Sequence, residues 1–190
     1  MPRLFTGLEI PNSQRLMLSL VQSGLSNVRW IDPSQLHITL RFIGDVSLRE
    51  ANDIVDILSG PLWRSPKIEM TELACFGGTK PTSIHARVDH DPALLALATS
   101  QDRLMQRLGM RPEKRRFSPH VTLARCKGAT SDTVAKYLDA RAGLNIPEFR
   151  PTRFVLYSAR ESIGGGPYRI EESWPFESPP AHADERTAHQ

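Results

Sequence analysis

One short segment occurs twice in the chain, and this repetition constrains the fold more than any other feature. The segment His37–Leu40 reads HITL, and His120–Leu123 reads HVTL, 83 residues later. The same shift brings the helix-like and strand-like stretches of the two halves into register, so that each half runs strand, helix, strand, helix, strand. We therefore expect a single bilobal domain of residues 1–176, with an internal repeat at about residues 2–76 and 82–159.

Helix boundaries are marked by their usual residues. The pattern S-x-x-E at Ser47–Glu50 is a capping box, and Asp91 followed by Pro92 is typical of a helix start. In each expected helix the apolar residues recur on one face, and the glycine that follows them marks the end of the helix. The four expected helices cover about residues 13–23, 47–60, 91–109 and 131–143. Strand-like runs are found at Arg3–Glu9, Leu36–Ile43, Lys67–Phe76, Ser83–Asp89, His120–Arg125, Arg150–Ser158 and Tyr168–Ser173.

The repeated segments carry the side chains of acid–base chemistry at phosphorus. Alternate residues of a strand share a face, so His37 projects with Thr39, and His120 with Thr122. Two lobes related by pseudo-two-fold symmetry would point both pairs into one cleft. A neutral imidazole can then take a proton from the attacking oxygen while a protonated one gives a proton to the leaving oxygen. The hydroxyls can donate to the non-bridging oxygens of the phosphate.

Strand alternation also makes predictions for neighbouring residues. Arg41 has the parity of the first His-Thr pair, whereas Phe42 has the parity of the core residues. Arg125 has the core parity as well, so it reaches the cleft only where its strand twists or ends. His85 and His90 have no counterparts in the other half, and we expect them at the surface.

The positive charge is concentrated around the second pair. The whole chain has a formal net charge of only +3, but Arg103–Lys127 holds eight basic residues and one acid, Glu113. Such a cluster attracts a polyanion. Arg115 and Arg116 are the better phosphate candidates in it, because a guanidinium clamps phosphate with two hydrogen bonds.

The composition excludes several classes of protein. Two cysteines are too few for a disulfide framework or a cysteine zinc site, and no carboxylate or third histidine recurs at metal-ligand spacing. No apolar run has the length of a signal peptide or a membrane span. We therefore expect a cytoplasmic monomer without metal, cofactor or membrane partner. Residues 177–190 are expected to be a disordered tail, and Gly164–Gly166 a hairpin loop.

Four motifs together resemble one known family. They are RLF at 3–5, W-x₆-HITLRFIG at 30–44, RRFSPHVTLAR at 115–125 and GPYRIEESWPF at 166–176. The chain resembles the two-histidine (2H) phosphoesterase superfamily over residues 2–176. It is most similar there to the bacterial and archaeal RNA 2′,3′-cyclic phosphodiesterases, the LigT or "2′-5′ RNA ligase" family. PTSIHARV at 81–88 departs from this pattern, since family members commonly have P-R-V-L-W there.

The resemblance implies an α+β fold of two pseudo-symmetric lobes, each an antiparallel sheet with outer helices, around a central metal-free cleft. It implies opening of an RNA 2′,3′-cyclic phosphate to a 2′-phosphomonoester. His37 would donate a proton to the leaving 3′ oxygen, and His120 would be the base that activates water. The expected substrate contacts are Thr39, Thr122, Arg115, Arg125, Tyr168 and Phe5.

Three alternatives remain open. The same displacement with a 5′-hydroxyl in place of water is 2′-5′ ligation of RNA. The same chemistry also serves a cyclic phosphate on a small nucleotide. A protein that binds RNA through its basic face without turnover is the third alternative, and the presence of both histidines favours an enzyme over it.

Overall fold

Nine strands and four α-helices make up the part of the chain that the computed structural model describes, residues 1–159 and 167–177. The expected loop at Gly164–Gly166 and residues 178–190 of the expected tail fall outside these described residues. Glu177 was wrongly expected in the tail, since its amide donates to the Trp63 carbonyl at 2.8 Å. The strands are β1 (Arg3–Glu9), β2 (Val28–Trp30), β3 (His37–Asp45), β4 (Ile68–Phe76), β5 (Ser83–Val88), β6 (His120–Cys126), β7 (Ile146–Phe149), β8 (Arg153–Ala159) and β9 (Tyr168–Pro175). The helices are α1 (Asn12–Leu20), α2 (Leu48–Ser59), α3 (Pro92–Arg107) and α4 (Ser131–Asp139).

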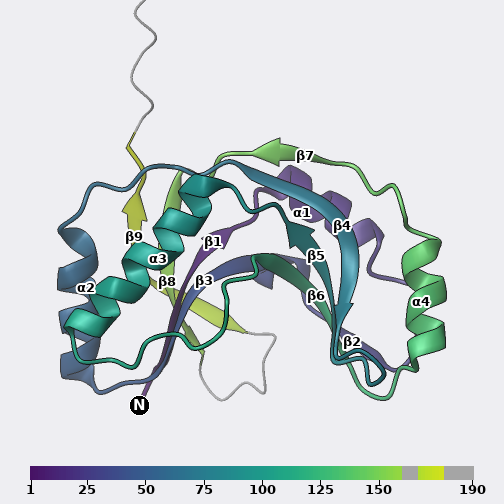
Figure 1. Ribbon diagram of the computed structural model, residues 1–190, viewed down its shortest axis with the longest axis horizontal. Helices are drawn as coiled ribbons and strands as arrows, with labels where there is room; N and C mark the ends of the chain where they lie inside the picture. Colours follow the sequence, from purple (N-terminus) through teal and green to yellow (C-terminus); the bar gives the residue numbers. More distant parts are fainter. Residues whose placement is uncertain (160–166, 178–190) are drawn as a thin grey trace, which may run out of the picture.

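The strands form one curled antiparallel sheet in the order β7-β4-β5-β6-β3-β1-β8-β9, with β2 paired to β6. This order is symmetric about its centre, where β3 and β6 meet with Ile38 opposite Val121. Figure 1 shows an arch with the helices on its outer side. The expected α+β fold of two pseudo-symmetric antiparallel lobes is thus confirmed. We call β3, β1, β8 and β9 the first lobe, and β6, β5, β4 and β7, with β2, the second.

The helix starts follow the local signals in the sequence. The Ser47 hydroxyl accepts a hydrogen bond from the Glu50 amide, and the Glu50 carboxylate accepts one from the Ser47 amide, so the capping box is complete. The Asp91 carboxylate accepts from the amides of Ala93 and Leu94 at the start of α3. Both starts lie where the sequence predicts them.

Two helices cross from one lobe to the other. Helix α1 follows β1 of the first lobe but packs on the second, where Gln14 donates to the Pro147 carbonyl of β7. Helix α3 follows β5 of the second lobe but packs on the first, where Asp102 forms an ion pair with Arg41 of β3. Figure 1 shows α2 and α3 on one side of the arch and α1 and α4 on the other. Each lobe therefore includes a helix from the other half of the chain.

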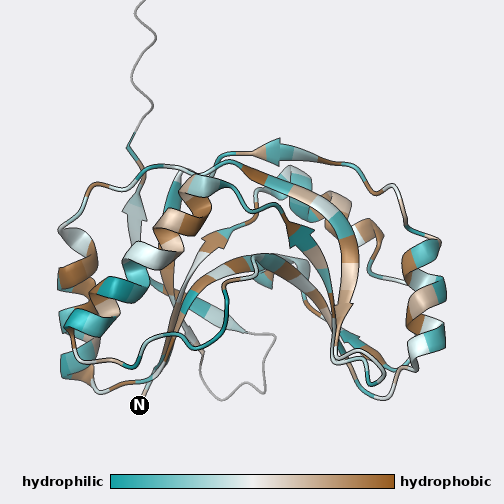
Figure 2. Ribbon diagram, in the orientation of Figure 1, coloured by the Kyte–Doolittle hydropathy of each residue, from teal (hydrophilic) through white to brown (hydrophobic). Residues whose placement is uncertain are grey.

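The core lies between the sheet and the helices. Figure 2 shows hydrophobic and hydrophilic residues interspersed along the strands and the helices. The largest side chains that are fully buried include Leu4, Leu8, Ile38, Ile54 and Phe154. None of the helices in residues 1–159 and 167–177 is long and apolar enough to cross a membrane.

The two histidine-bearing strands depart from simple alternation at the same point. Thr6 pairs with Arg41 but Gly7 with Thr39, so Leu40 is an extra residue, a β-bulge, in β3. Leu123 is the extra residue in β6 in the same way, because Ile84 pairs with Ala124 but His85 with Thr122. Beyond each bulge the side chains change face.

The bulge overturns the predictions made for the residues that follow it in β3. Arg41 is buried with 7% of its side chain exposed, whereas Phe42 is 47% exposed and lines the concave cavity. The expected faces were therefore wrong for both residues, since Arg41 points to the core and Phe42 to the cavity. The corresponding bulge in β6 brings Arg125 to the concave face, which alternation alone does not.

Candidate active site

A cavity of about 240 Å³ opens on the concave face, where β3 and β6 meet. Seven of the expected site residues line it: Phe5, His37, Thr39, His120, Thr122, Arg125 and Tyr168. They come from four strands of the sheet, β1, β3, β6 and β9. Arg115 is not among the lining residues and lies exposed in the segment between α3 and β6. Phe42, which was expected on the core face, also lines the cavity, and so does Gln35, for which no role was expected.

The two imidazoles are held in the same way. His37 Nδ1 lies 2.8 Å from the carbonyl of Gln35, and His120 Nδ1 lies 2.8 Å from the carbonyl of Ser118. Each ring is thus fixed by the carbonyl two residues before it. A carbonyl only accepts, so each Nδ1 carries the hydrogen, and in the neutral ring Nε2 has the free lone pair. Nε2 is therefore the nitrogen available for proton transfer on both sides of the cavity.

His37 is surrounded by aromatic rings of the first lobe. The ring centroids of Phe5, Tyr157 and Tyr168 lie 5.1, 5.3 and 5.1 Å from that of His37. Phe5 is buried and stacks on Tyr157, while the Tyr168 amide donates to Gln35 Oε1 at 2.6 Å. Gln35 thereby contacts two elements of the site: its carbonyl holds His37, and its side chain holds β9, which carries Tyr168. Such packing fixes the ring and removes water from it.

His120 is surrounded by a smaller ring cluster of the second lobe. The ring centroids of Phe76 and His85 lie 5.0 and 5.2 Å from that of His120. The prediction that His85 lies at the surface was wrong, because β4 and β6 flank β5 and Phe76 stacks on the His85 ring. His90, which follows β5, is exposed as expected.

Both cavity histidines favour the neutral form. Burial lowers the pKa of His37 to about 4 against an opposing effect of the Gln35 carbonyl, and the positive charges of His120 and Arg125 lower it further. Burial also lowers the pKa of His120, again opposed by a carbonyl, that of Ser118, and assisted by Arg125. Without an anion in the cavity, both imidazoles are therefore uncharged near neutral pH.

The other polar groups of the cavity suit an anion. Thr39 and Thr122 lie two residues after the histidines, on strands that are symmetric about the centre of the sheet. Arg125 is exposed at the cavity, and its charge lowers the pKa of both His37 and His120. Hydroxyl donors and a guanidinium beside two imidazoles are the groups that bind and stabilise a reacting phosphate.

Arg41 lies behind this cavity and holds the basic segment. Its Nε atom is 2.6 Å from Asp102 Oδ1, and its Nη2 donates to the Arg111 carbonyl at 2.5 Å. Asp102 Oδ1 also accepts from the Glu113 amide at 3.1 Å. The buried ion pair thus fixes the segment 111–116, which carries Arg115, against β3 and α3.

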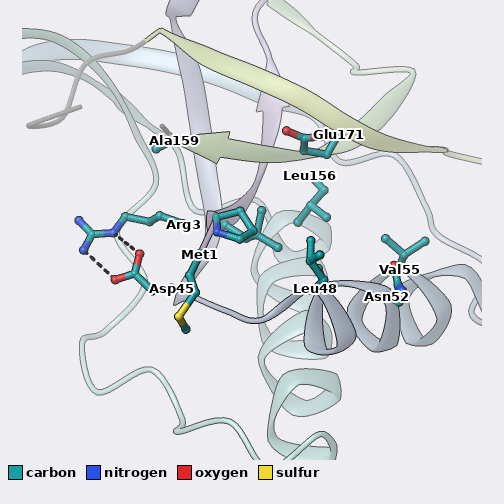
Figure 3. A pocket seen from close by; sticks show the side chains of 12 residues that line it. Met1, Arg3, Asp45, Leu48, Asn52, Val55, Leu156, Ala159 and Glu171 are labelled. Carbon is teal, nitrogen blue, oxygen red and sulfur yellow. Dashed lines mark hydrogen bonds and ion pairs between the residues drawn. The ribbon is translucent and has the colours of Figure 1, made fainter. Parts of the chain in front are cut away.

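A second, larger hollow of about 940 Å³ lies beside the cavity, between α2 and the strands β8 and β9 (Figure 3). It shares Arg3 with the cavity, and Arg3 forms an ion pair with Asp45 at 3.1 Å. Its lining has no imidazole in the part of the chain that the structure describes. Across residues 1–159 and 167–177 there is also no group of three or more His, Cys, Asp or Glu side chains placed to hold a metal ion.

Comparisons with known proteins identify a family of phosphoesterases. The family profile described as "LigT like Phosphoesterase" matches residues 8–85 and 88–168. An RNA 2′,3′-cyclic phosphodiesterase of Aeropyrum pernix is 34% identical over 117 residues, which are 60% of this chain and 66% of that protein. A protein of the same name from Archaeoglobus fulgidus is 29% identical over 162 residues, which are 81% of this chain and 92% of that protein.

Solved structures of LigT share the fold. The crystal structure of Escherichia coli LigT complexed with 3′-AMP superposes with a TM-score of 0.73 at 19% identity, covering 94% of this chain and 100% of that one. The family profile spans both histidine-bearing strands and most of the sheet. The chain therefore belongs to the LigT-like phosphoesterase family.

Proposed function

We propose that the protein is an RNA 2′,3′-cyclic phosphodiesterase that opens the cyclic phosphate to a 2′-phosphomonoester with two histidines and without a metal ion. The observation that carries this proposal is the pair of imidazoles, His37 and His120, held alike on one cavity with Thr39 and Thr122 beside them. The names of the archaeal relatives support an RNA substrate, and the 3′-AMP in the E. coli LigT structure supports a nucleotide in the cleft.

The proposed reaction is one in-line displacement at phosphorus. His120 Nε2 takes a proton from water as the water oxygen forms a bond to phosphorus. The bond from phosphorus to O3′ breaks, and the protonated His37 gives its Nε2 proton to that oxygen. Thr39, Thr122 and Arg125 donate hydrogen bonds to the non-bridging oxygens, where negative charge is greatest. The products are a 2′-phosphate and a 3′-hydroxyl, with the two histidines in exchanged protonation states.

His37 becomes protonated when the anionic substrate binds. In the free protein burial lowers the pKa of His37 to about 4, so the ring is neutral near pH 7. A bound phosphodiester carries a negative charge, and an adjacent anion favours the protonated imidazole, which raises the pKa. Substrate binding thus prepares the acid, while Arg125 and burial keep His120 neutral as the base.

The basic segment supports an RNA substrate longer than one nucleotide. Arg115 and Arg116 are exposed on the segment that Arg41 anchors near the cavity. Neutralising both should weaken kcat/KM for an oligoribonucleotide and lower its salt dependence by about 0.7 in log–log slope for each phosphate that they neutralise. Neutralising Arg49 and Lys67 is the matched control. Arg49 is exposed on α2, and Lys67 is held by Glu69 and Glu148. A cyclic mononucleotide should be insensitive to either change.

The decisive experiment uses an oligoribonucleotide that ends in a 2′,3′-cyclic phosphate, assayed in EDTA, with identification of the 2′- or 3′-phosphate product. His37→Ala and His120→Ala should each lower kcat by about 10²–10⁴-fold. The exposed His90→Ala is the control and should have no effect. Loss of wild-type activity in EDTA, a 3′-phosphate product, or full activity of both cavity variants would contradict the proposal.

A further inference from the structure

A third histidine lies beside the cavity and has no part in the reaction proposed above. His85, on β5, pairs in register with Thr122 of β6 and Ala74 of β4, and only 2% of it is exposed. It stacks on Phe76 with ring centroids 4.0 Å apart and an interplanar angle of 18°. A buried side chain next to a reacting group influences the orientation and the proton affinity of that group.

The geometry of the three rings shows how His85 contacts His120. Phe76 and His85 lie nearly parallel, and the His120 centroid is 5.0 Å from the first and 5.2 Å from the second. The His120 ring is inclined to them by 81° and 67°. Since it is about equally far from both, His120 lies beside the stacked pair and not on top of it. The pair thus forms a wall along one side of the His120 ring.

The first lobe forms the corresponding wall with different residues. Gly7 occupies the position opposite Thr39, as His85 does opposite Thr122. A Cβ at Gly7 would lie 2.8 Å from the Ile38 carbonyl and 3.2 Å from the Tyr157 ring, so no side chain fits there. Tyr157 reaches in from β8 and supplies the ring beside His37. In the second lobe the residue opposite the threonine, His85, carries the ring beside the cavity histidine itself. In the first lobe that ring comes from Tyr157 on the neighbouring strand β8.

His85 is neutral in this position. Its Nδ1 is buried and has no hydrogen-bond partner among residues 1–159 and 167–177, and burial lowers its pKa to about 4, helped by the positive charges of His120 and Arg87. It therefore acts on His120 through its shape and by excluding water, and not as a charge, near neutral pH. The charged groups facing His120 are Arg125 on its own strand and Arg87 on β5, which is paired with Glu72 of β4 at 2.8 Å. The other titratable group facing it is His37 on β3.

We propose that His85 is a positioning residue for His120: with Phe76 it forms the wall that holds the His120 ring against the Ser118 carbonyl, with Nε2 unprotonated toward the cavity. The wall excludes water from one side of the ring, and the edge of Phe76, which carries the positive end of the ring quadrupole, favours a neutral neighbour. His120 is thereby kept ready to accept the proton of the attacking water. This inference rests on the proposed function for its meaning in catalysis, but the physical claim about His120 can be tested without turnover.

The test is a histidine-ring NMR titration of the full-length protein, combined with pH profiles of kcat and KM. In His85→Ala the pKa of His120 should rise toward 6.5, and each unit of rise should cost about tenfold in rate on the acid side of the profile, with KM little changed. His85→Phe should restore both the titration and kcat. It should also melt at a higher temperature than the wild type, because the unpaired buried nitrogen is gone.

Two further variants complete the design. Phe76→Ala, at a residue that is 38% exposed, should shift the His120 titration in the same direction and gives the answer should His85→Ala fail to fold. His90→Phe is the matched control for a histidine-to-phenylalanine change on the surface. An unshifted His120 titration in both His85→Ala and Phe76→Ala, or no recovery in His85→Phe, would overturn the inference. These titrations stand apart from the test of the proposed function, which depends on the wild-type activity in EDTA, on the activities of the His37 and His120 variants and on the product.

Discussion

The buried ion pair behind the cavity leads to a prediction on stability that can be worked out from its geometry. Arg41 is 7% exposed and Asp102 21%, with 2.6 Å between Nε and Oδ1. Replacing Asp102 by Asn leaves the guanidinium buried, with a distant partner in Glu113 at 3.8 Å. Removing one partner of a buried ion pair costs about 3–5 kcal/mol, since the remaining charge is not compensated. For a chain of this length that corresponds to a fall in Tm of about 6–20 °C.

The replacement of Arg41 alone, and of Arg41 and Asp102 together, should cost less than the replacement of Asp102 alone would suggest. Arg41→Met leaves Asp102 partly exposed and still bonded to Gln106 Nε2 and to the Glu113 amide, so we expect a smaller cost of about 2–3 kcal/mol. The double variant Arg41→Met/Asp102→Asn removes both charges, and its cost should be well below the sum of the single costs.

Urea denaturation of the four proteins measures the free energy of unfolding and completes the double-mutant cycle. The same proteins, assayed on cyclic-phosphate oligonucleotides and mononucleotides, report on the segment 111–116. Where the ion pair is lost, the segment 111–116 is no longer held against β3 and α3, and KM should rise for the oligonucleotide but not for the mononucleotide. A cost of Asp102→Asn below about 1 kcal/mol, or costs that simply add in the double variant, would refute the reasoning.

Three other predictions concern pH, packing and capping. In the proposed mechanism His120 must be neutral and His37 protonated, and the pKa values of both lie below the ordinary 6.5. The value of kcat/KM should therefore fall on the acid side as His120 gains a proton and on the alkaline side as His37 loses one, with both limbs below pH 6.5. An alkaline limb above pH 7 contradicts this. Gly7→Ala forces a Cβ to 2.8 Å from the Ile38 carbonyl and should cost about 1–3 kcal/mol in a urea titration, whereas Gly60→Ala, with 3.8 Å of room, should not. Ser47→Ala removes the capping box of α2 and should cost about 1 kcal/mol by the same measurement; an unchanged midpoint would show that the cap is not needed.

Local signals in the sequence predicted the parts of the fold that depend on local chemistry. The caps at Ser47 and Asp91 depend on neighbours within a few residues, and they are where the sequence places them. Strand β1 covers the expected residues Arg3–Glu9, and β6 begins at His120 as expected. Strands β2 and β7 were missed because three and four residues, one of them Pro147, carry too little alternation to stand out. These short strands exist because longer strands offer them an edge.

The errors near the cavity have a different origin. A bulge is defined by the register of the partner strand, and nothing within HITLRF marks Leu40 as the extra residue that turns Arg41 inward. The burial of His85 depends on Phe76 from another strand, so its own sequence neighbours give no sign of it. Seven of the eight expected site residues nevertheless line the cavity. Four of them, His37, Thr39, His120 and Thr122, follow from the repeated H-x-T pattern, which fixes the side chains that share a face. The other three were expected from the resemblance to the family and not from the pattern.

The exchange of helices between the lobes bears on how the molecule loses its structure. Unfolding the first lobe would remove the elements that α3 packs on, and α3 is joined directly to β5 of the second. Unfolding the second lobe would likewise release α1, together with its bond from Gln14 to Pro147. Neither lobe can therefore melt while the other remains intact. A protein with two lobes of similar shape should show one cooperative transition instead of two, and no single cut of the chain should yield a half that folds alone.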